Sequence, residues 1–247
     1  MGVTSNISWC DSTWNPWHGC HKVSTGCKHC YMFSGKKRFG QDPDVIMRSK
    51  PWTFEMPLRL MGYKKVFACS WSDFFIEESD PWRDEAMDII RRTQHLTYQI
   101  LTKRPERAYE YLNEYRYRVP QGNWSYPAWP LPNVWVGVSV ENQTTASERL
   151  RWLAGIIASK RFISYEPALG PVNFRPWLPY IDWVICGGES GPGYRTCNVA
   201  WLQQCADQCF NAGVPVWVKQ DSGPLPGCQG RIPDALWGRK AFPLDAR

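Results

Sequence analysis

The sequence lacks the segments that carry a chain to or through a membrane. The N-terminal stretch Met1 to Asn6 has neither the basic nor the apolar region of a secretion signal, and Asn6 stands where a myristoylation signal has Ser or Thr. The longest uncharged stretch, residues 119–140, contains four prolines and therefore cannot form one continuous transmembrane helix. We expect a soluble, cytoplasmic protein with no membrane partner.

Internal repeats and low-complexity tracts are also missing, and the composition excludes disorder. Of the 247 residues, 43% are hydrophobic and 21% charged, which is enough apolar material for a folded core. Single α/β barrels commonly have this length, so we predict one domain over residues 1–247. Lys and Arg exceed Asp and Glu by 29 to 23, and the net charge of +6 suits a polyanionic partner.

The ten cysteines do not indicate a disulfide scaffold, because such scaffolds belong to short secreted chains. Their spacing favours metal or redox chemistry instead. Cys20, Cys27 and Cys30 fall within eleven residues, whereas most of the others are dispersed. Cys205 and Cys209 lie one helical turn apart, and small apolar thiols on a buried helix face explain them better than a second metal site.

From about residue 64 onward, runs rich in β-branched and aromatic residues alternate with segments of helical period. This is the pattern of βα units around a parallel sheet. A weak first strand is predicted near Ile7 to Trp9. Six further strands are predicted at residues 65–69, 98–101, 134–138, 161–164, 183–186 and 214–218. The sequence thus predicts an α/β fold, a partial TIM-like (β/α) barrel of six to seven parallel strands.

The segments between the strands carry helix signals. One helix is predicted to begin at Asp80-Pro81, another follows Thr145, and a third begins at Asn198. Pro105 lies early in a fourth. The stretch Tyr115 to Pro132 is dense in Pro, Trp and Tyr and is predicted to be a long ordered loop inserted before the next strand.

A polar segment follows each of the six later strands. In parallel βα folds the loops at the carboxyl ends of the strands converge on one site. Loops are polar in any case because they face water, but six at one edge together predict a site there. The segments are Ser70 to Asp73, Thr102 to Arg104, Ser139 to Asn142, Tyr165 to Pro167, Gly187 to Gly191 and Lys219 to Ser222.

The loop after the weak first strand holds the three clustered thiols. A structural zinc site is closed by four ligands, and electron-transfer 4Fe–4S clusters commonly use four cysteines. Three thiols therefore leave one metal position open for substrate or cofactor. Two other interpretations stay open, namely ordinary buried thiols and a closed zinc site whose fourth ligand is His18, His21 or His29.

Several motifs, spread over nearly the whole chain, resemble those of a phage-borne family of uncharacterised proteins. That family is similar to a compact branch of the radical S-adenosylmethionine (radical SAM) superfamily. The motifs are Trp14-Asn15-Pro16-Trp17-x-Gly19-Cys20, Cys27-x-x-Cys30-Tyr31, Leu101-Thr102-Lys103-Arg104-Pro105, Glu166-Pro167-x-x-Gly170-Pro171 and Gly187-Gly188-Glu189-Ser190-Gly191.

The resemblance implies that Cys20, Cys27 and Cys30 hold a 4Fe–4S cluster whose open iron binds S-adenosylmethionine. Reductive cleavage, with electrons from a flavodoxin or ferredoxin, gives a 5′-deoxyadenosyl radical that takes hydrogen from the substrate. A phage origin implies the host-cell cytoplasm. The chain departs from the superfamily in spacing the first two cysteines three residues further apart, and in carrying Gly-Gly-Glu after the sixth strand instead of the second.

Residues at the strand ends have the chemistry that this cofactor needs. A methionine ammonium requires an acceptor such as Glu189, Ser139 or Glu166, and a ribose diol suits Glu141 or Asn142. Structural ion pairs are the alternative for Glu141 and Glu166, with Lys103, Arg104 or Lys219 as partners. We further assign His29, Gly187 and Gly188 to the cofactor, and Asp73, Lys103, Arg104 and Lys219 to the substrate.

The 15 tryptophans outnumber either other aromatic residue, and several stand near basic residues, as Trp52 does near Lys50. Rings interleaved with Lys and Arg hold unstacked bases, although core packing explains tryptophans equally well. Our leading hypothesis is a radical SAM enzyme that takes hydrogen from a nucleic-acid base or nucleotide, in DNA modification or repair. The alternative is a non-catalytic zinc- or cluster-stabilised nucleic-acid-binding module.

Overall fold

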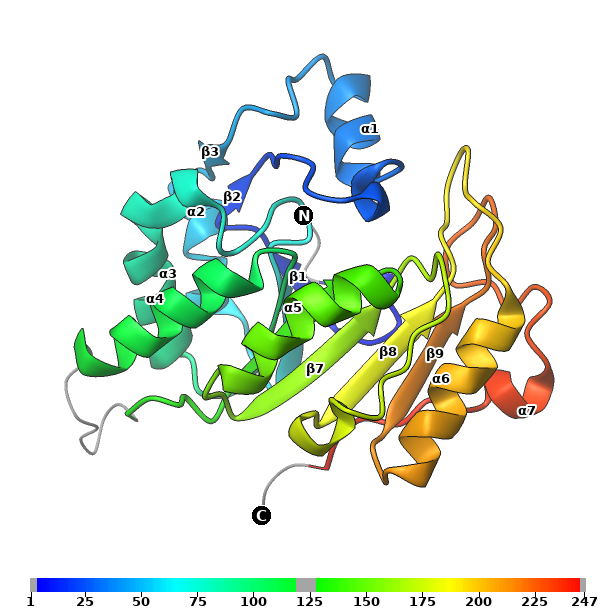
Figure 1. Cartoon of the computed structure of the whole chain (residues 1–247). Helices are drawn as coiled ribbons and strands as arrows, with labels where there is room; N and C mark the ends of the chain where they lie inside the picture. Colours follow the sequence, from blue (N-terminus) through cyan, green and yellow to red (C-terminus); the bar gives the residue numbers. More distant parts are fainter. Residues whose placement is uncertain (1–3, 119–127, 245–247) are drawn as a thin grey trace.

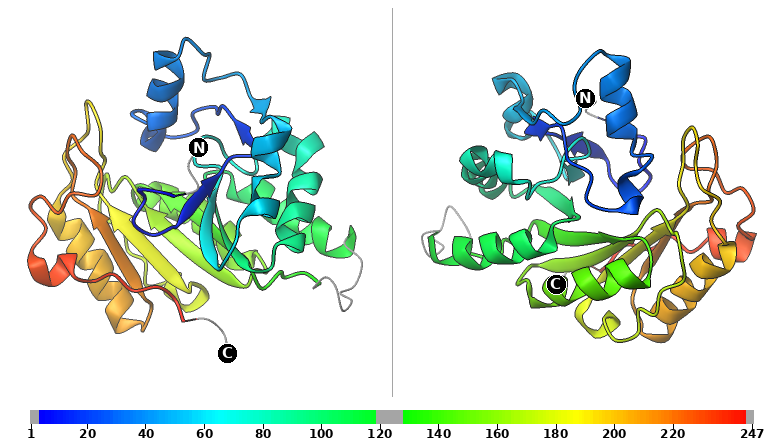
Figure 2. Two further views of the ribbon diagram at one scale, coloured as in Figure 1. Left: turned by 180° about the vertical axis from the view of Figure 1, so that it is seen from behind. Right: turned by 45° about the horizontal axis from the view of Figure 1, so that its top comes forward.

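The computed structural model describes residues 4–118 and 128–244, and its centre is one curled sheet of seven parallel strands (Figures 1 and 2). The order of strands in the sheet follows the order along the chain, so the predicted partial barrel is confirmed. The strands are β1 (Ser12–Trp14), β4 (Lys64–Ala68), β5 (Leu96–Thr102), β6 (Val134–Val140), β7 (Lys160–Tyr165), β8 (Trp183–Gly187) and β9 (Val216–Gln220). A separate antiparallel pair consists of β2 (Trp17–His18) and β3 (Met47–Arg48).

Helices connect the strands and cover the convex face of the sheet (Figure 1). The main ones are α3 (Asp80–Arg92), α4 (Pro105–Arg118), α5 (Gln143–Gly155) and α6 (Val199–Asn211). Shorter helices are α1 (Tyr31–Arg38), α2 (Pro51–Phe54) and α7 (Asp234–Trp237), and the 3-10 helices are η1 (Thr25–Cys27), η2 (Met56–Arg59), η3 (Glu77–Ser79) and η4 (Leu178–Tyr180). None of the helices in the described ranges has the length and apolar character needed to cross a membrane.

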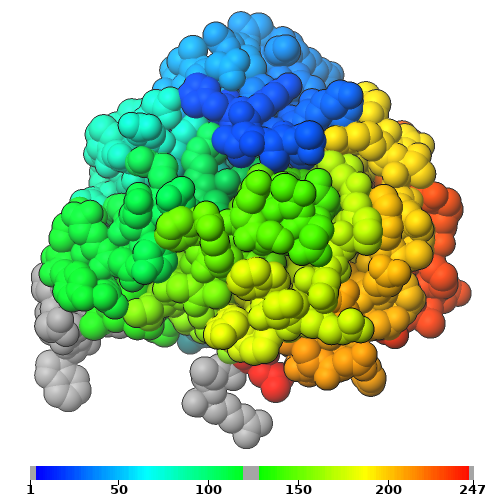
Figure 3. All heavy atoms as spheres, in the orientation of Figure 1, coloured from blue at the N-terminus to red at the C-terminus, as the bar shows by residue number. Residues whose placement is uncertain are grey.

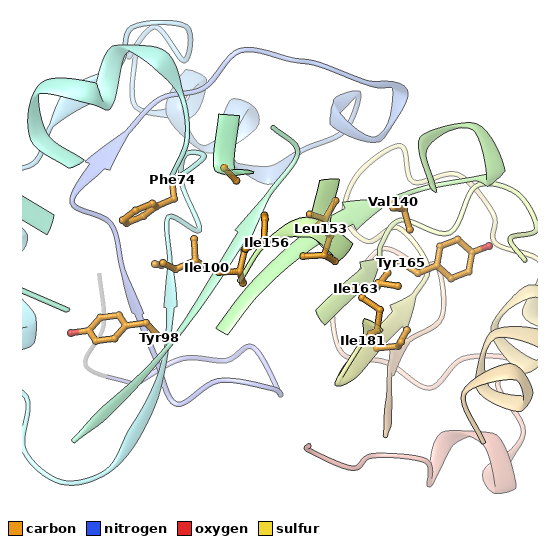
Figure 4. Packing of buried hydrophobic residues seen from close by; sticks show 14 of the residues in the cluster. Phe74, Tyr98, Ile100, Val140, Leu153, Ile156, Ile163, Tyr165 and Ile181 are labelled. Atoms are coloured by element: carbon orange, nitrogen blue, oxygen red, sulfur yellow. The ribbon is translucent and has the colours of Figure 1, made fainter. Parts of the chain in front are cut away.

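The main core lies between the convex face and these helices. Alternate residues of each strand point to this side, so Ile100, Ile163 and Tyr165 belong to the same buried cluster as Leu153 of α5 (Figure 4). All seven residues of β6 are buried, because this central strand has both of its faces covered.

The amino-terminal half of the concave face is filled by aromatic rings. Trp135, Phe162 and Trp183 occupy neighbouring strands, with ring centroids 5.7 and 5.9 Å apart for the pairs that include Trp183. Trp9 closes the group from one side, and Phe242 from the C-terminal segment closes it from the other. This aromatic floor leaves the carboxyl-terminal half of the concave face for polar side chains.

The predicted first strand was wrong in position. Residues Ile7 to Trp9 lie outside the sheet, and β1 begins five residues later than predicted, at Ser12. The physical reason is that Trp9 serves as part of the aromatic floor, 4.7 Å from the Phe67 ring between centroids, while Gln99 holds the Trp9 carbonyl by a hydrogen bond of 3.1 Å.

The predicted loop at Tyr115 to Pro132 needs a correction at its start. Residues 115–118 form the last turn of α4, because Tyr115 continues the buried face of that helix and stacks on Tyr111 at 5.7 Å. Residues 119–127 lie outside the described ranges. Residues 128–132 lead into β6 without regular structure, and Trp129 packs edge-on against Tyr115.

We predict that Gly137→Ala destabilises the protein by about 1–3 kcal/mol, because a Cβ atom there would lie 2.3 Å from the Phe162 ring. Urea unfolding measures the change. Gly223→Ala is the control, since a Cβ atom at Gly223 meets nothing within 4 Å, and its effect should stay below about 0.5 kcal/mol. Adding Phe162→Leu should weaken the effect of Gly137→Ala, and full additivity of the two substitutions would contradict this account.

Candidate functional site

The connection between β1 and β4 crosses the carboxyl edge of the sheet, and we refer to residues 15–63 as the cap. It contains β2, η1, α1, β3, α2 and η2 and forms the top of the molecule in Figures 1 and 3. The three clustered cysteines lie in its first third. Contacts between the cap and the loops after the strands therefore decide where these thiols sit.

Glu141, directly after β6, is the first of these contacts. Its side chain is fully buried, and Arg149 of α5 lies 3.1 Å from Oε2. The Lys103 ammonium is 3.6 Å from Oε1, which also accepts a hydrogen bond of 3.0 Å from the Ser24 hydroxyl of the cap. The ion pair anticipated between Glu141 and Lys103 is therefore present, with Arg149 as a second and closer cation.

Gly26 of η1 lies directly against this carboxylate. A Cβ atom at Gly26 would be 2.3 Å from Glu141 Oε1, so only glycine lets the backbone come so close. The residue that follows is Cys27, which is buried. The buried carboxylate thus holds the turn that carries the central thiol of the three.

Glu189, two residues after β8, makes the second contact through Arg195. The Arg195 side chain donates to both carboxylate oxygens, at 2.8 Å from Nε and 2.5 Å from Nη2, and its Nη1 donates to the Thr25 carbonyl at 2.9 Å. Burial raises the pKa of Glu189, but the hydrogen bonds from Arg195 outweigh it, and the net pKa lies below the usual 4.5. The Gly-Gly-Glu segment therefore contacts residues 20–30, which we call the cysteine loop, through Arg195.

Asp73 and Arg104 make the third contact. The buried Asp73 carboxylate accepts hydrogen bonds from the Thr102 hydroxyl at 2.7 Å and the Lys103 amide at 2.9 Å, and Arg104 Nη1 lies 3.2 Å from it. Arg104 also donates to the His21 carbonyl at 3.2 Å and lies 3.8 Å from the Cys20 sulfur. Asp73 therefore orients a guanidinium toward the first thiol.

The three thiols are protected from solvent to different degrees. Cys27 is buried, whereas Cys20 and Cys30 are partly exposed. Burial raises the pKa of Cys20 to about 12 and also raises the pKa of Cys30, and the Cys27 thiol adds to both shifts. Without a cation Cys20 and Cys30 therefore favour the thiol form, and a bound metal would favour the thiolate.

The donor set fits a thiophilic metal in its chemistry, with three neighbouring sulfurs and a guanidinium beside one of them. Within the residues that the structure describes, no three Cys, His, Asp or Glu side chains are already arranged around one metal position.

The histidines of the cap have separate surroundings. His21 Nε2 lies 2.6 Å from Glu78 Oε1, so its ring forms a hydrogen bond with that carboxylate. The ring of His29 lies beside Gly193 in the loop after β8, where a Cβ atom would be 3.4 Å from it. His18 belongs to β2, and its buried Nδ1 has no hydrogen-bond partner.

Below the cap, Ser139, Ser164 and Glu166 line the upper concave face. Ser139 and Ser164 are register partners in β6 and β7, and Glu166 follows β7. The Lys219 ammonium of β9 lies 3.0 Å from Glu166 Oε1, so the second anticipated ion pair is also present, and Ser164 donates to Oε2 at 3.3 Å. These four groups form a polar band above the aromatic floor.

Three of the predicted cofactor residues stabilise local structure at the same edge, namely Asn142, Gly187 and Gly188. Asn142 is the N-cap of α5, and its side chain accepts a hydrogen bond of 3.0 Å from the Thr145 amide. A Cβ atom at Gly188 would be 2.3 Å from the Ser222 nitrogen, so this glycine allows the loops after β8 and β9 to touch. Gly187 lies against the Glu166 carboxylate in the same way.

Four later cysteines, Cys186, Cys197, Cys205 and Cys209, belong to the convex core, whereas Cys228 is exposed. Cys186 of β8 and Cys205 and Cys209 of α6 are almost fully buried. Hydrogen bonds with the Cys186 and Cys209 thiols, together with burial, raise the pKa of Cys205 far above its usual value. Their surroundings are apolar, as expected for a buried helix face.

Sequence reasoning missed the residues that hold the cap in place. Arg149 and Arg195 follow their carboxylate partners by eight and six residues, and Ser24 and Gly26 precede Cys27. Gly26 carried a weak signal, as a glycine beside a candidate ligand. The arginines carried none, because a surface arginine on a helix or loop has the same local sequence pattern.

The fold and this edge together define an α/β half-barrel protein with a cysteine loop over a polar mouth. Residues 4–228 match the family described as Protein of unknown function (DUF5131), and the chain belongs to that family. No curated protein and no solved structure matches the chain.

We predict that Glu189→Gln lowers the free energy of unfolding by about 1–3 kcal/mol at pH 7, because it removes the charge that Arg195 needs. The folded-state pKa of Glu189 is lowered, so its stabilisation is complete above pH 4.5 and disappears as the pH falls through the folded-state value. Urea unfolding at pH 7 and pH 3 checks both points.

The control for this prediction is Glu114→Gln, whose exposed carboxylate lies 3.5 Å from Arg118 and should contribute less than about 0.5 kcal/mol. Equal stability of Glu189→Gln and the wild type at pH 7 would contradict the prediction. So would a stability difference that persists unchanged at pH 3.

Proposed function

We propose that this protein is a radical SAM enzyme that takes a hydrogen atom from a nucleic-acid base or nucleotide. The observation that carries the proposal is the placement of three neighbouring thiols on a loop that is fastened over the polar mouth of a parallel half-barrel. Parallel βα folds perform chemistry at this edge of the sheet. Three thiols match a cluster with one open metal position better than a closed four-ligand site.

Cys20, Cys27 and Cys30 are the residues that would hold a 4Fe–4S cluster, which when bound would supply an electron for the cleavage of S-adenosylmethionine to methionine and a 5′-deoxyadenosyl radical. An external donor of the flavodoxin or ferredoxin type would provide that electron. Arg104, 3.8 Å from the Cys20 sulfur, stabilises the thiolate form that metal binding requires.

The polar band supplies groups for a zwitterionic cofactor. Glu166 and Lys219 pair with each other at 3.0 Å, so a zwitterion would bind them by replacing that ion pair with its own ammonium and carboxylate groups. Ser139, on the same concave face, is a further acceptor. Glu141 and Glu189 retain a role as acceptors only through oxygens that Arg149 and Arg195 already use. We therefore place the main cofactor contacts on Ser139, Glu166 and Lys219.

Cations at the mouth support an anionic substrate. Lys103 and Arg104 follow β5 and sit between the thiols and the buried carboxylates Asp73 and Glu141. Each has a carboxylate that fixes it, so both are oriented before a ligand arrives. A phosphate beside a base that has been turned out of its stack fits this arrangement, as enzymes that act on bases require.

The proposal predicts a paramagnetic cluster that responds to the cofactor. The protein is purified anaerobically, reconstituted with iron and sulfide, reduced, and studied by electron paramagnetic resonance with and without S-adenosylmethionine. We expect a reduced 4Fe–4S signal that changes when S-adenosylmethionine is added. The signal should be lost in Cys27→Ala, because Cys27 is the central thiol of the loop.

Cys228→Ala is the matched control, since Cys228 is an exposed cysteine outside the cap and its removal should leave the signal intact. A single tightly held zinc ion, with no cluster and no response to S-adenosylmethionine, would overturn the proposal. That outcome would favour the zinc-stabilised nucleic-acid-binding module instead.

A further inference from the structure

The positive charge of the chain is concentrated in the cap. Residues 15–63 contain eight Lys and Arg against three Asp and Glu, a net charge of +5 out of the +6 of the whole chain. The remaining residues are thus nearly neutral, with 21 basic and 20 acidic side chains. If the net charge were spread evenly along the chain, the cap would carry about +1. The observed +5 therefore makes the cap the part of the surface that attracts a polyanion most strongly.

Five of the eight cap cations are exposed and free of carboxylate partners within the described residues. Lys22, Lys28, Lys37, Arg38 and Lys50 are exposed, and none of them forms an ion pair within the part of the chain that the structure describes. Many arginines elsewhere do form such pairs, as Arg149 does with Glu141 and Arg195 with Glu189. Unpaired cations on one segment are available for an external anion.

Exposed aromatic rings accompany these cations. Tyr31 is 53% exposed, Phe39 70% and Trp52 73%, although burial of such rings ordinarily stabilises a fold. The Arg59 guanidinium lies 3.8 Å from the centroid of the Trp52 ring, so this ring is already held in a fixed position. An exposed ring beside a cation is the arrangement on which unpaired bases stack.

This surface is continuous with the mouth of the half-barrel. The Tyr31 hydroxyl donates to the Ser70 carbonyl, in the loop after β4, at 2.6 Å. Lys28 stands between Cys27 and Cys30, and Lys37 and Arg38 close α1. From there the cap runs across the top of the molecule to α2 and Trp52 (Figures 1 and 3). A strand lying on the cap would pass beside the cysteine loop.

We propose that the outer surface of the cap binds single-stranded nucleic acid, with Lys28, Lys37, Arg38 and Lys50 on phosphates and Phe39 and Trp52 against bases. A duplex would use the cations but not the rings, because its base faces are already stacked. The inference deepens the proposed function by naming an unpaired polynucleotide as the substrate class. Binding itself requires no cluster.

The test is fluorescence anisotropy of a labelled 20-residue oligothymidylate with the full-length protein, at several salt concentrations. We expect the double variant Lys37→Gln, Arg38→Gln to bind more weakly and to lower the slope of log affinity against log salt by about 1.4, since each phosphate contact on a single strand contributes about 0.7. Phe39→Ala and Trp52→Ala should each weaken binding between about fivefold and 150-fold, from ~1–3 kcal/mol per stacked base, without changing that slope.

Arg175→Gln and Tyr180→Ala are the matched controls, because they remove an exposed cation and an exposed ring outside the cap and should leave binding unchanged. Thermal unfolding of each variant confirms that its fold is intact. Oligonucleotide binding is measured before and after cluster reconstitution. Absence of a cluster signal in electron paramagnetic resonance would therefore overturn the proposed enzyme but not the nucleic-acid surface.

Three outcomes would overturn the inference. The first is no salt-dependent binding of the oligonucleotide, and the second is equal loss of binding in the cap and control variants. The third is tighter binding to a 20-base-pair duplex, or to vesicles of anionic lipid, with no effect of Phe39→Ala or Trp52→Ala. That last result would mean that the surface binds phosphate groups through its cations alone and does not stack bases.

Discussion

The buried carboxylate of Glu141 is the constraint on which the candidate site depends. A charge without solvent is stable only when cations and hydrogen-bond donors surround it, and here these come from three separate parts of the chain. Arg149 belongs to the helix after the same strand, Lys103 to the preceding strand end and Ser24 to the cap. Satisfying one side chain therefore ties the cysteine loop, two strand ends and α5 into one unit.

The concave face of the half-barrel has an apolar half and a polar half. Aromatic rings fill the amino-terminal half, and a polar band of serines, a carboxylate and a lysine occupies the carboxyl-terminal half. Because side chains alternate along each strand, the convex residues remain free to form the main core with the helices. The cap then covers the mouth and is held there by Glu141 and by Arg195.

Much of this architecture could be predicted from the sequence, and both failures concern aromatic residues. The six later strands and their polar ends follow from local patterns of β-branched and polar residues, and all six are present within one to two residues. Ile7 to Trp9 has a strand-like composition but fills the aromatic floor, and Tyr115 is aromatic but continues a helix. Trp9 packs against rings of distant strands, which local pattern does not reveal. Tyr115 stacks on Tyr111 one helical turn earlier and packs against Trp129, fourteen residues later.

The sequence by itself determined the fold class, the cysteine loop and the set of polar residues at the strand ends, because each depends on spacing along the chain. It also determined that the cap carries most of the net charge. Only the tertiary structure decided which of these polar residues hold the loop and which line the mouth. Glu141, Glu166 and Glu189 look alike in sequence, yet Arg149 and Arg195 engage two of them while Glu166 faces Lys219, since ion-pair partners are chosen by proximity in space.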